Sequence, residues 1–536
     1  MDMSGAPSLT APVERAVREP DTAAAGQQTR PQHRHLLTLS DRVCRDERGA
    51  NRRIVAHDLD GPREPTGPDK LPAVAGSSGI VGRFASRGAT ASSAVSSWAA
   101  ALVLGCLVVV FVAQAVPRLS APLGASHDGF NAAVWSVGAR AIRSEGIAKS
   151  KLGAEAPHQD QYEGPYANHP PLIYVATWLG RGLFGDNERG SRMTVLIPSV
   201  VGLLLLYALL RQLGIPPLAT SIGVGVSALT PMFLIYGVVL DTGMLSLPIG
   251  IAFLVACTRP KPSPAVCIVT AVTAAVLCLA SWHGALLVAL VLILSLATDW
   301  YGDGIRMPIA VGAACGLVIL GAWMLWVHGG FAPLLDIFSD QTSERATLVG
   351  AGKAEAKYLV QTLLFTVILL PFAFLVSVVR PSLRPIGIPA VAVALIFGVV
   401  LYSGGAIHDY WNYWVLLPLA VGVAGAVQLL NRLHGVLRAI PLAACLLIVV
   451  GGLTMNSRAE TDIKRGWTSG QRLRDIQWPE SQEHAYVIAE TPEDYYPQVG
   501  YYANRPVVHV SATQAENDRI GVVVDARIKP WIVRIY

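Results

Sequence analysis

Long apolar segments without any charged side chain constrain the fold of this 536-residue chain more than any other feature. The first runs from Ser97 to Val116, and only 15% of all residues are charged, against about 25% in soluble domains. Ten more follow, near 193–210, 218–240, 242–257, 264–281, 284–298, 307–327, 358–379, 386–407, 413–430 and 439–456. Such segments are typical of helices that cross a bilayer, so the sequence predicts a polytopic α-helical membrane protein with about eleven crossings.

The distribution of basic residues predicts an orientation for these crossings. The loops at 211–217, 259–262, 299–306, 380–385 and 431–438 each contain Arg or Lys, whereas the short turns near 241, 282 and 408 contain none. Basic loops stay on the cytoplasmic side of a membrane. We therefore expect a multi-pass protein of the plasma (inner) membrane with its N-terminus in the cytoplasm.

One further apolar stretch, Pro170 to Phe184, is interrupted by Arg181. It is shorter than a crossing, and its basic residue favours a helix that lies in the membrane interface. Counting it as a twelfth crossing would invert every later loop and place the basic loops outside. We therefore keep eleven crossings as the prediction.

Composition divides the chain into three parts. Residues 1–94 are polar and show no sustained periodicity, so we expect a disordered cytoplasmic tail. Residues 95–456 form the predicted transmembrane domain, with outside loops at 117–192 and 328–357. Residues 457–536 contain the strand-like runs "AYVIAE", "PVVHV" and "GVVVDARI", with the helix-like "PEDYYPQVGYYAN" between the first two. This last part is predicted to be a small extracytoplasmic α/β domain.

Polar and aromatic residues gather at the predicted outer ends of the crossings. They are Asp128 after the first crossing, Asn168 and His169 in "YANHPPLIY", Asp241 in "LDTGML", His283 in "SWHGALL", Arg345 in the 328–357 loop, and His408 and Tyr410 in "AIHDYWNYW". Separate loops thus present acids, histidines and aromatic rings to one membrane face. A shared outward-facing pocket is the functional interpretation.

Each of these residues also has a purely structural interpretation. Asp128 and Asp241 are both placed to cap the helices that follow them. His283 and His408 suit a membrane interface, and Arg345 suits a solvated loop. Capping and catalysis are compatible roles for an aspartate, so both interpretations stay open for Asp128.

The order of five motifs resembles the GT-C glycosyltransferases, especially the protein O-mannosyltransferases and the lipid A aminoarabinose transferases. The motifs are an Asp soon after the first crossing with an amphipathic helix ending near Gly146, "YANHPPLIY", "GSRMTVLIPSVVGLLLLYALLRQLG", "LDTGML" and "HDYWNYWVLLPLA". The resemblance runs from about residue 98 to 430. It implies a GT-C type transmembrane domain joined to the small C-terminal domain.

The resemblance also implies a reaction. GT-C enzymes move a sugar from a polyprenyl-phosphate donor to an acceptor hydroxyl on a glycan, lipid or protein. We expect Asp128 to accept the proton of that hydroxyl, with inversion at the sugar, and Asp241 to orient the acceptor or support Asp128. The remaining expected substrate-binding residues are His408, Tyr410, Arg345, His283, Asn168, His169 and Arg140, among which His408, Arg345 and His283 are the preferred partners of the leaving phosphate.

Two departures from the family pattern refine this expectation. Protein O-mannosyltransferases usually show two adjacent acids after the first crossing, but here Gly129 follows Asp128. The 328–357 loop contains no His, which argues against the divalent metal found in some relatives. We therefore assign no metal ligands and no definite cofactor, and a divalent metal stays open as the less favoured alternative.

Two other classes of protein fit less well. A transporter or flippase for a lipid-linked glycan is the main alternative, but it predicts paired ionisable residues inside the crossings and an inverted repeat, and neither is apparent. A nucleic-acid partner is not expected, because the net charge is only +5 and no basic stripe carries interleaved aromatic residues.

Overall fold

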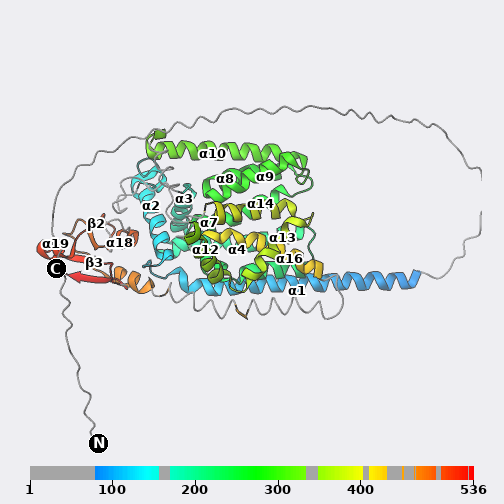
Figure 1. Cartoon of the computed structure of the whole chain (residues 1–536), viewed down its shortest axis with the longest axis horizontal. Helices are drawn as coiled ribbons and strands as arrows, with labels where there is room; N and C mark the ends of the chain where they lie inside the picture. The colour runs from blue at the N-terminus through cyan, green and yellow to red at the C-terminus, as the bar shows by residue number, and fades with distance from the viewer. Residues whose placement is uncertain are drawn as a thin grey trace, which may run out of the picture. The chain divides into compact units, whose positions relative to one another are not determined.

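The computed structural model describes residues 79–155, 169–332, 348–401, 410–430, 450–451, 464, 466–489, 496–528 and 530–535. The predicted tail 1–94 lies outside these ranges up to residue 78, as does most of the predicted crossing 439–456. The described part is mostly helical, and it carries one small sheet near the C-terminus (Figure 1). This confirms the predicted fold class.

The helices of the membrane part follow one another closely along the chain (Figure 1). They are α1 (Gly79–Leu119), α2 (His127–Lys149), α3 (Leu172–Phe184), α4 (Glu188–Gln212), α5 (Pro217–Ala228), α6 (Pro231–Tyr236), α7 (Thr242–Cys257), α8 (Pro264–Ala280), α9 (Trp282–Ala297), α10 (Arg306–His328), α12 (Leu348–Leu363), α13 (Thr366–Val379), α14 (Arg384–Leu395) and α16 (Leu416–Leu430), with short turns η1 (Lys151–Gly153), η2 (Asp303–Ile305), η3 (Ile396–Val400) and η4 (Trp411–Val415).

Four described helices or helical segments are long and apolar enough to cross a membrane by themselves. They are Trp98–Leu119 of α1, α4, α10 with η2, and η4 with α16, and the bent pair of α12 and α13 would add a fifth. Six shorter apolar helices accompany them. The chain is therefore a multi-pass membrane protein, while the predicted number of eleven crossings stays a prediction.

Small residues let the membrane helices approach closely. A Cβ added to Gly312 of α10 would lie 2.2 Å from the carbonyl oxygen of Ala271 in α8, and one added to Gly422 of α16 would lie 2.0 Å from that of Ala373 in α13. Helices in lipid gain most of their association energy from packing rather than from the hydrophobic effect, and small residues favour it. These close contacts fix α10 against α8 and α16 against α13.

Two predicted crossings are broken in the structure. The segment 218–240 forms α5 and α6, because Pro231 starts a new helix that Thr230 caps through its side chain. The segment 358–379 begins earlier, at Leu348, and its two helices meet at a bend of 99°. An apolar run alone does not reveal such breaks, since every residue in it still suits the membrane.

The C-terminal part carries a four-stranded sheet with the order β2-β1-β3-β4. Strands β1 (Ala485–Ile488), β2 (Val507–His509) and β3 (Val522–Asp525) run parallel, while β4 (Ile532–Ile535) pairs antiparallel with β3. Helices α18 (Pro497–Ala503) and α19 (Ala512–Asn517) accompany the strands. The first three strands and α18 fall within the predicted runs, whereas β4 and α19 were not predicted.

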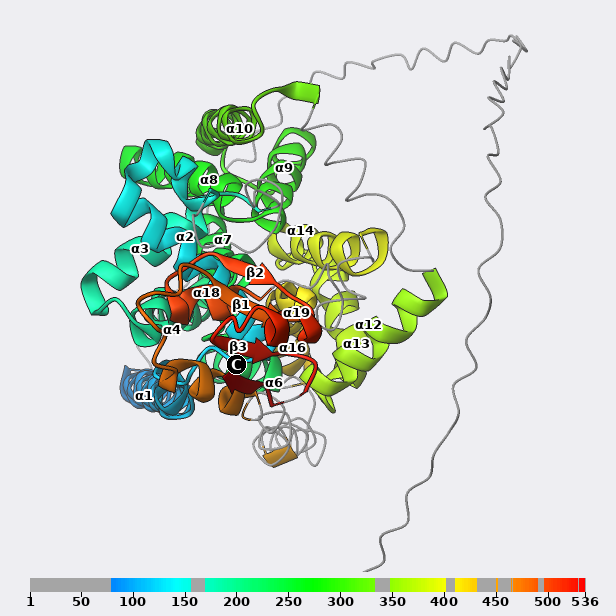
Figure 2. The ribbon, with the colours of Figure 1, turned by 90° about the vertical axis from the view of Figure 1, so that its left-hand side faces the viewer.

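Helix α18 joins this small domain to the membrane part, where it packs against α2 (Figures 1 and 2). The Tyr502 hydroxyl accepts a hydrogen bond from the backbone N–H of Leu123 at 2.8 Å, and the buried Gln498 amide donates to the carbonyl of Gly124 at 2.9 Å. Both partners lie in the connection between α1 and α2. The C-terminal domain therefore holds the segment that leads into α2.

Candidate active site

Helix α2 begins beside the membrane helices and carries the first predicted acid. The Ser126 side chain caps the helix by accepting a hydrogen bond from the backbone N–H of Gly129 at 3.3 Å. Asp128 therefore does not cap the helix, although its place in the first turn still favours a negative charge. Its side chain is 8% exposed.

Asp128 is held in a buried ion pair with Arg192 of α4. Their Oδ2 and Nη2 atoms lie 2.7 Å apart, and the Arg192 side chain is fully buried. Arg192 also donates to the backbone carbonyls of Ala121 and Leu119 in the connection before α2. One arginine thus fixes both the acid and the segment that precedes it.

Gly129, where relatives carry a second acid, is required by backbone packing. A Cβ at this position would lie 2.2 Å from the carbonyl oxygen of Gly124. Gly124 is in turn closed in by the backbone, since its own Cβ would lie 1.7 Å from the carbonyl oxygen of Gly466. An aspartate or glutamate does not fit here, so the departure from the family pattern has a steric cause.

The second predicted acid, Asp241, caps α7. Its Oδ1 accepts from the backbone N–H of Gly243 at 3.0 Å and from the hydroxyl of Thr242 at 3.3 Å, and its Oδ2 accepts from the Asn131 amide of α2 at 3.1 Å. Asp241 lies in the connection between α6 and α7, where burial raises its pKa to about 6. It can therefore exchange a proton close to neutral pH.

Asp241 lines a small hollow of about 20 Å³ that we call the acid pocket. Its walls come from five separate segments, with the residues His169, Asp241, Thr242, Gly243, Trp282, His283, Phe397, Tyr410 and Trp411. Four of the nine predicted site residues meet here, namely His169, Asp241, His283 and Tyr410. The structure thus brings together residues up to about 240 positions apart in the sequence.

Aromatic rings form most of the acid pocket wall. The His283 ring stacks on Phe397 with centroids 3.6 Å apart, and the Trp411 indole N–H donates to the Phe397 carbonyl at 3.0 Å. Burial lowers the pKa of His169 to about 4, so this imidazole is neutral at physiological pH. Aromatic walls with a few polar groups are the kind of lining found at sites for small organic ligands, although the hollow itself is small in this structure.

Asp128 is not part of the pocket lining, but its neighbours on α2 reach it. The His127 ring lies 6.1 Å from that of Tyr410, and Asn131 binds Asp241. Asp128 and Asn131 are three residues apart and so share one side of the helix. The two acids therefore belong to one assembly, with Asp241 in the pocket wall and Asp128 in the ion pair beside it.

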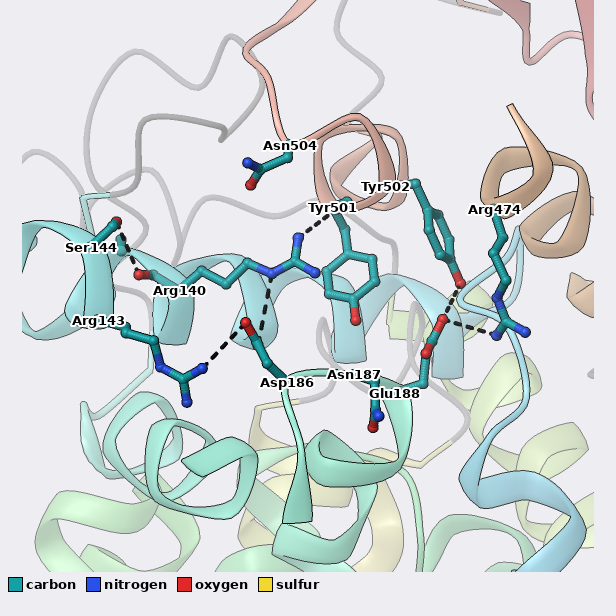
Figure 3. Close-up of a pocket in the computed structure, with 11 residues that line it drawn as sticks. Arg140, Arg143, Ser144, Asp186, Asn187, Glu188, Arg474, Tyr501, Tyr502 and Asn504 are labelled. Atoms are coloured by element: carbon teal, nitrogen blue, oxygen red, sulfur yellow. Dashed lines mark hydrogen bonds and ion pairs between the residues drawn. The ribbon is translucent and has the colours of Figure 1, made fainter. Parts of the chain in front are cut away.

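Arg140 lies in a different hollow, drawn in Figure 3. Its guanidinium stands 4.0 Å over the Tyr501 ring and donates to the Tyr501 carbonyl at 2.6 Å. Asp186 pairs with Arg143 at 3.3 Å in the same hollow. Glu188 there accepts from the Tyr502 hydroxyl, as Figure 3 shows. These contacts join α2, α4 and α18, so Arg140 binds the C-terminal domain and is separated from the acid pocket.

The remaining predictions lie outside the described residues. Asn168, Arg345 and His408 belong to segments that the structure does not describe, so their roles stay predictions. Within the described ranges, no three His, Cys, Asp or Glu side chains gather closely enough to hold a metal ion. Arg192 and Asn131 were not predicted to contribute. The Arg at the start of "GSRMTVL" was a visible signal for the first of them.

The fold of the chain is similar to that of several solved structures. The chain superimposes on ArnT from Cupriavidus metallidurans bound to undecaprenyl phosphate with a TM-score of 0.50 and 16% identity, over 76% of this chain and 86% of that one. ArnT and the oligosaccharyltransferases are GT-C proteins. The chain has the GT-C fold. The predicted resemblance is thereby confirmed at the level of fold.

Two further structures with the GT-C fold give lower scores. The apo form of the same ArnT has a TM-score of 0.49 and 16% identity, over 78% of this chain and 92% of that one. The apo oligosaccharyltransferase from Archaeoglobus fulgidus has a TM-score of 0.47 and 13% identity, over 79% of this chain and 65% of that one. No family model and no curated protein sequence matches the chain.

Proposed function

We propose that the protein is a membrane glycosyltransferase that moves a sugar from a polyprenyl-phosphate donor to an acceptor hydroxyl on a glycan, lipid or protein. The observation that carries this proposal is the acid pocket, in which a GT-C fold places Asp241, with a pKa of about 6, among aromatic rings. An ArnT with this fold has been solved bound to undecaprenyl phosphate, which supports a donor of the same class.

Asp241 is the better candidate for the proton acceptor. Its carboxylate lines the pocket, whereas Asp128 is committed to Arg192. A base works best when its pKa lies near the working pH, and the value of about 6 meets that requirement. We therefore exchange the two roles expected from the sequence, so that Asp241 accepts the proton and Asp128 holds α2 and Asn131 in place.

The proposed transfer has a simple atom balance. The acceptor hydroxyl gives its proton to the Asp241 carboxylate while its oxygen forms a bond to C1 of the sugar. The bond between C1 and the phosphate oxygen breaks, and the polyprenyl phosphate leaves with both electrons of that bond. An in-line attack inverts the configuration at C1.

The helix ends around the pocket suit a phosphate. Thr242 and Gly243 begin α7, Trp282 and His283 begin α9, and Trp411 begins η4. The N-terminal ends of helices carry partial positive charge, which stabilises anions. The N–H groups of Gly243 and Gly284 are already bonded to Asp241 and Ser281, so the attraction comes from this charge and not from those two donors. We therefore place the donor phosphate near these ends, with its lipid tail in the bilayer.

The proposed orientation follows the basic loops of the sequence. It puts the N-terminus in the cytoplasm and the acid pocket and the C-terminal domain on the outer face of the plasma (inner) membrane. A reporter fused after residue 536 should therefore be active only on the outer side. A cytoplasmic reporter signal there would refute this orientation.

Mass spectrometry of envelope glycans tests the proposed function. Glycolipids and cell-wall fractions from a strain without the gene should lack a sugar that the complemented strain carries. The Asp241→Asn variant should fail to restore it at equal membrane abundance. Unchanged glycans in the deletion strain would instead favour a non-enzymatic role. Unchanged glycosidic linkages, with lipid-linked sugars accumulating on one side of the membrane, would favour a flippase.

A further inference from the structure

A group of buried polar atoms without hydrogen-bond partners adjoins the acid pocket. Within the described residues they are Nε2 of His283, Nδ2 of Asn412, Nε1 of Trp414 and both carboxylate oxygens of Glu355. Buried polar atoms in proteins nearly always have partners, because an unpaired one costs about 1–3 kcal/mol. Several such atoms in one place indicate a ligand.

These residues, which we call the polar cluster, are close to one another. The His283 ring stacks on Phe397 and lies 6.0 Å from the Trp414 ring. Gly398 follows Phe397, and a Cβ added to it would lie 3.1 Å from Oδ1 of Asn412 and 3.4 Å from Oε1 of Glu355. Both oxygens thus lie close to the Gly398 backbone, where a larger residue would crowd them. The polar cluster begins at His283 in the pocket wall and continues past Phe397 to Glu355.

The backbone at this point is also unusual. Residues Ile396–Val400 form a π-helix at the end of α14, which places Phe397 in the pocket wall and Gly398 beside Glu355. Short π-helical turns are rare and occur frequently at functional sites. The widened turn therefore supports a binding role for the polar cluster.

The chemistry of the polar cluster selects a class of ligand. Glu355 is only 8% exposed and lies inside α12, so its carboxylate, unlike Asp241 at the start of α7, has no N-terminus of its own helix to offset its repulsion of a phosphate. Glu355 and the Asn412 carbonyl accept hydrogen bonds, whereas the Asn412 amide and the Trp414 indole donate them. Neighbouring aromatic rings offer flat apolar faces. This combination fits a neutral ring that carries several hydroxyl groups.

We propose that the polar cluster, together with the adjoining acid pocket, binds the sugar ring of the donor, with Glu355 and Asn412 as the hydroxyl-binding pair. This inference rests on the proposed function and assigns its sugar-recognition residues. The phosphate then lies at the helix ends near Asp241, away from Glu355. Glu355 is a specificity-determining residue, and its removal affects the sugar-bearing lipid alone.

Binding of two kinds of lipid tests this proposal. The full-length protein in nanodiscs is titrated with undecaprenyl phosphate and with a panel of undecaprenyl-phosphate hexoses and pentoses. The wild-type protein should bind at least one sugar-bearing lipid more tightly than the bare lipid. Glu355→Ala should weaken that binding about tenfold, as expected for a lost hydrogen bond to a charged group, and leave the bare lipid unchanged. Glu355→Gln, which keeps one acceptor oxygen, should recover part of the loss.

Two controls separate binding from folding. Ser377→Ala removes a buried hydroxyl that bonds the Pro418 carbonyl in α16, and it should change neither affinity. Glu355→Gln should not lower the melting temperature of the ligand-free protein, because glutamine has nearly the same shape and keeps an acceptor oxygen for the Asn412 side chain. A clear fall in that temperature would assign Glu355 a structural role and overturn the proposal.

The lipid titrations distinguish failure of the proposed function from failure of the proposed sugar site. If the wild-type protein binds neither lipid class, the proposed function fails. If it binds bare undecaprenyl phosphate but no sugar-bearing lipid more tightly, or if Glu355→Ala weakens both equally, the proposed function survives and the sugar site is refuted.

Discussion

Arg192 and Asp128, 64 residues apart in the sequence, form an ion pair of 2.7 Å inside the protein. The arginine also binds the connection before α2, so the pair joins α4 to the start of α2. Asn131, in the same part of α2, donates a hydrogen bond to Asp241 in the acid pocket. The ion pair therefore supports the pocket without lining it.

Breaking this ion pair should destabilise the protein strongly. Arg192→Met leaves the Asp128 carboxylate buried without its partner, which costs about 3–5 kcal/mol. Thermal unfolding in detergent measures the effect. The double variant Arg192→Met/Asp128→Asn should be more stable than Arg192→Met alone, because it removes the orphaned charge. Equal melting temperatures for the single and double variants would show that the pair is not coupled.

Gly129 should not tolerate a side chain. Gly129→Ala forces a methyl group against the Gly124 carbonyl and should cost about 1–3 kcal/mol, and Gly129→Asp should cost more. Gly321→Ala in α10 is the matched control, because a Cβ there meets nothing within 4 Å. Thermal unfolding compares the three variants. A stable Gly129→Asp protein would contradict the steric explanation of this glycine.

Tyr502 should restrain the segment that leads into α2, because its hydroxyl bonds that segment to the C-terminal domain. Tyr502→Phe removes the hydroxyl that Leu123 and Glu188 both bind, which costs about 1–3 kcal/mol. Hydrogen exchange should accelerate in residues 120–131 and stay unchanged in α8 and α10. Tyr486→Phe, on β1, serves as the control and should change neither region. Faster exchange throughout the protein would indicate general unfolding rather than a local clamp.

The rate of transfer should depend on the protonation of Asp241. The carboxylate accepts a proton only when it is ionised, and burial raises its pKa to about 6. The value of kcat/KM should therefore fall about tenfold for each unit of pH below 6 and level off above it. A pH series with a saturable lipid donor measures this. A flat profile between pH 5 and 7 would exclude Asp241 as the base.

The sequence predicts the long helices well and their interruptions poorly. The predicted limits of α8 and α10 lie within one residue of the observed ones, because a polar residue or a glycine stands at each end of both helices. The break at Thr230 and Pro231 carries a helix-start signal, but apolar residues on both sides hide it. His283 was placed in a turn, whereas Ser281 caps α9 and brings His283 into its first turn.

The candidate site also contains some residues that the sequence predicts and others that it does not. Asp241, His169, His283 and Tyr410 could be predicted because each is a polar or aromatic residue at the end of an apolar run. The partner of Asp128 and the role of Glu355 depend on contacts between distant segments. Neither periodicity nor composition reports such contacts.

Comparison of Asp241→Asn with Asp128→Asn tests the central claim most directly. Purified variants in nanodiscs are supplied with the donor and acceptor identified from the deletion strain, and release of polyprenyl phosphate is measured across pH. Asp241→Asn should lose about 10²- to 10⁴-fold in turnover while it still binds the lipid donor, whereas Asp128→Asn should keep the apparent pKa near 6 at reduced stability. Wild-type turnover by Asp241→Asn, or loss of the pH dependence in Asp128→Asn alone, would contradict the assignment of Asp241 as the catalytic base.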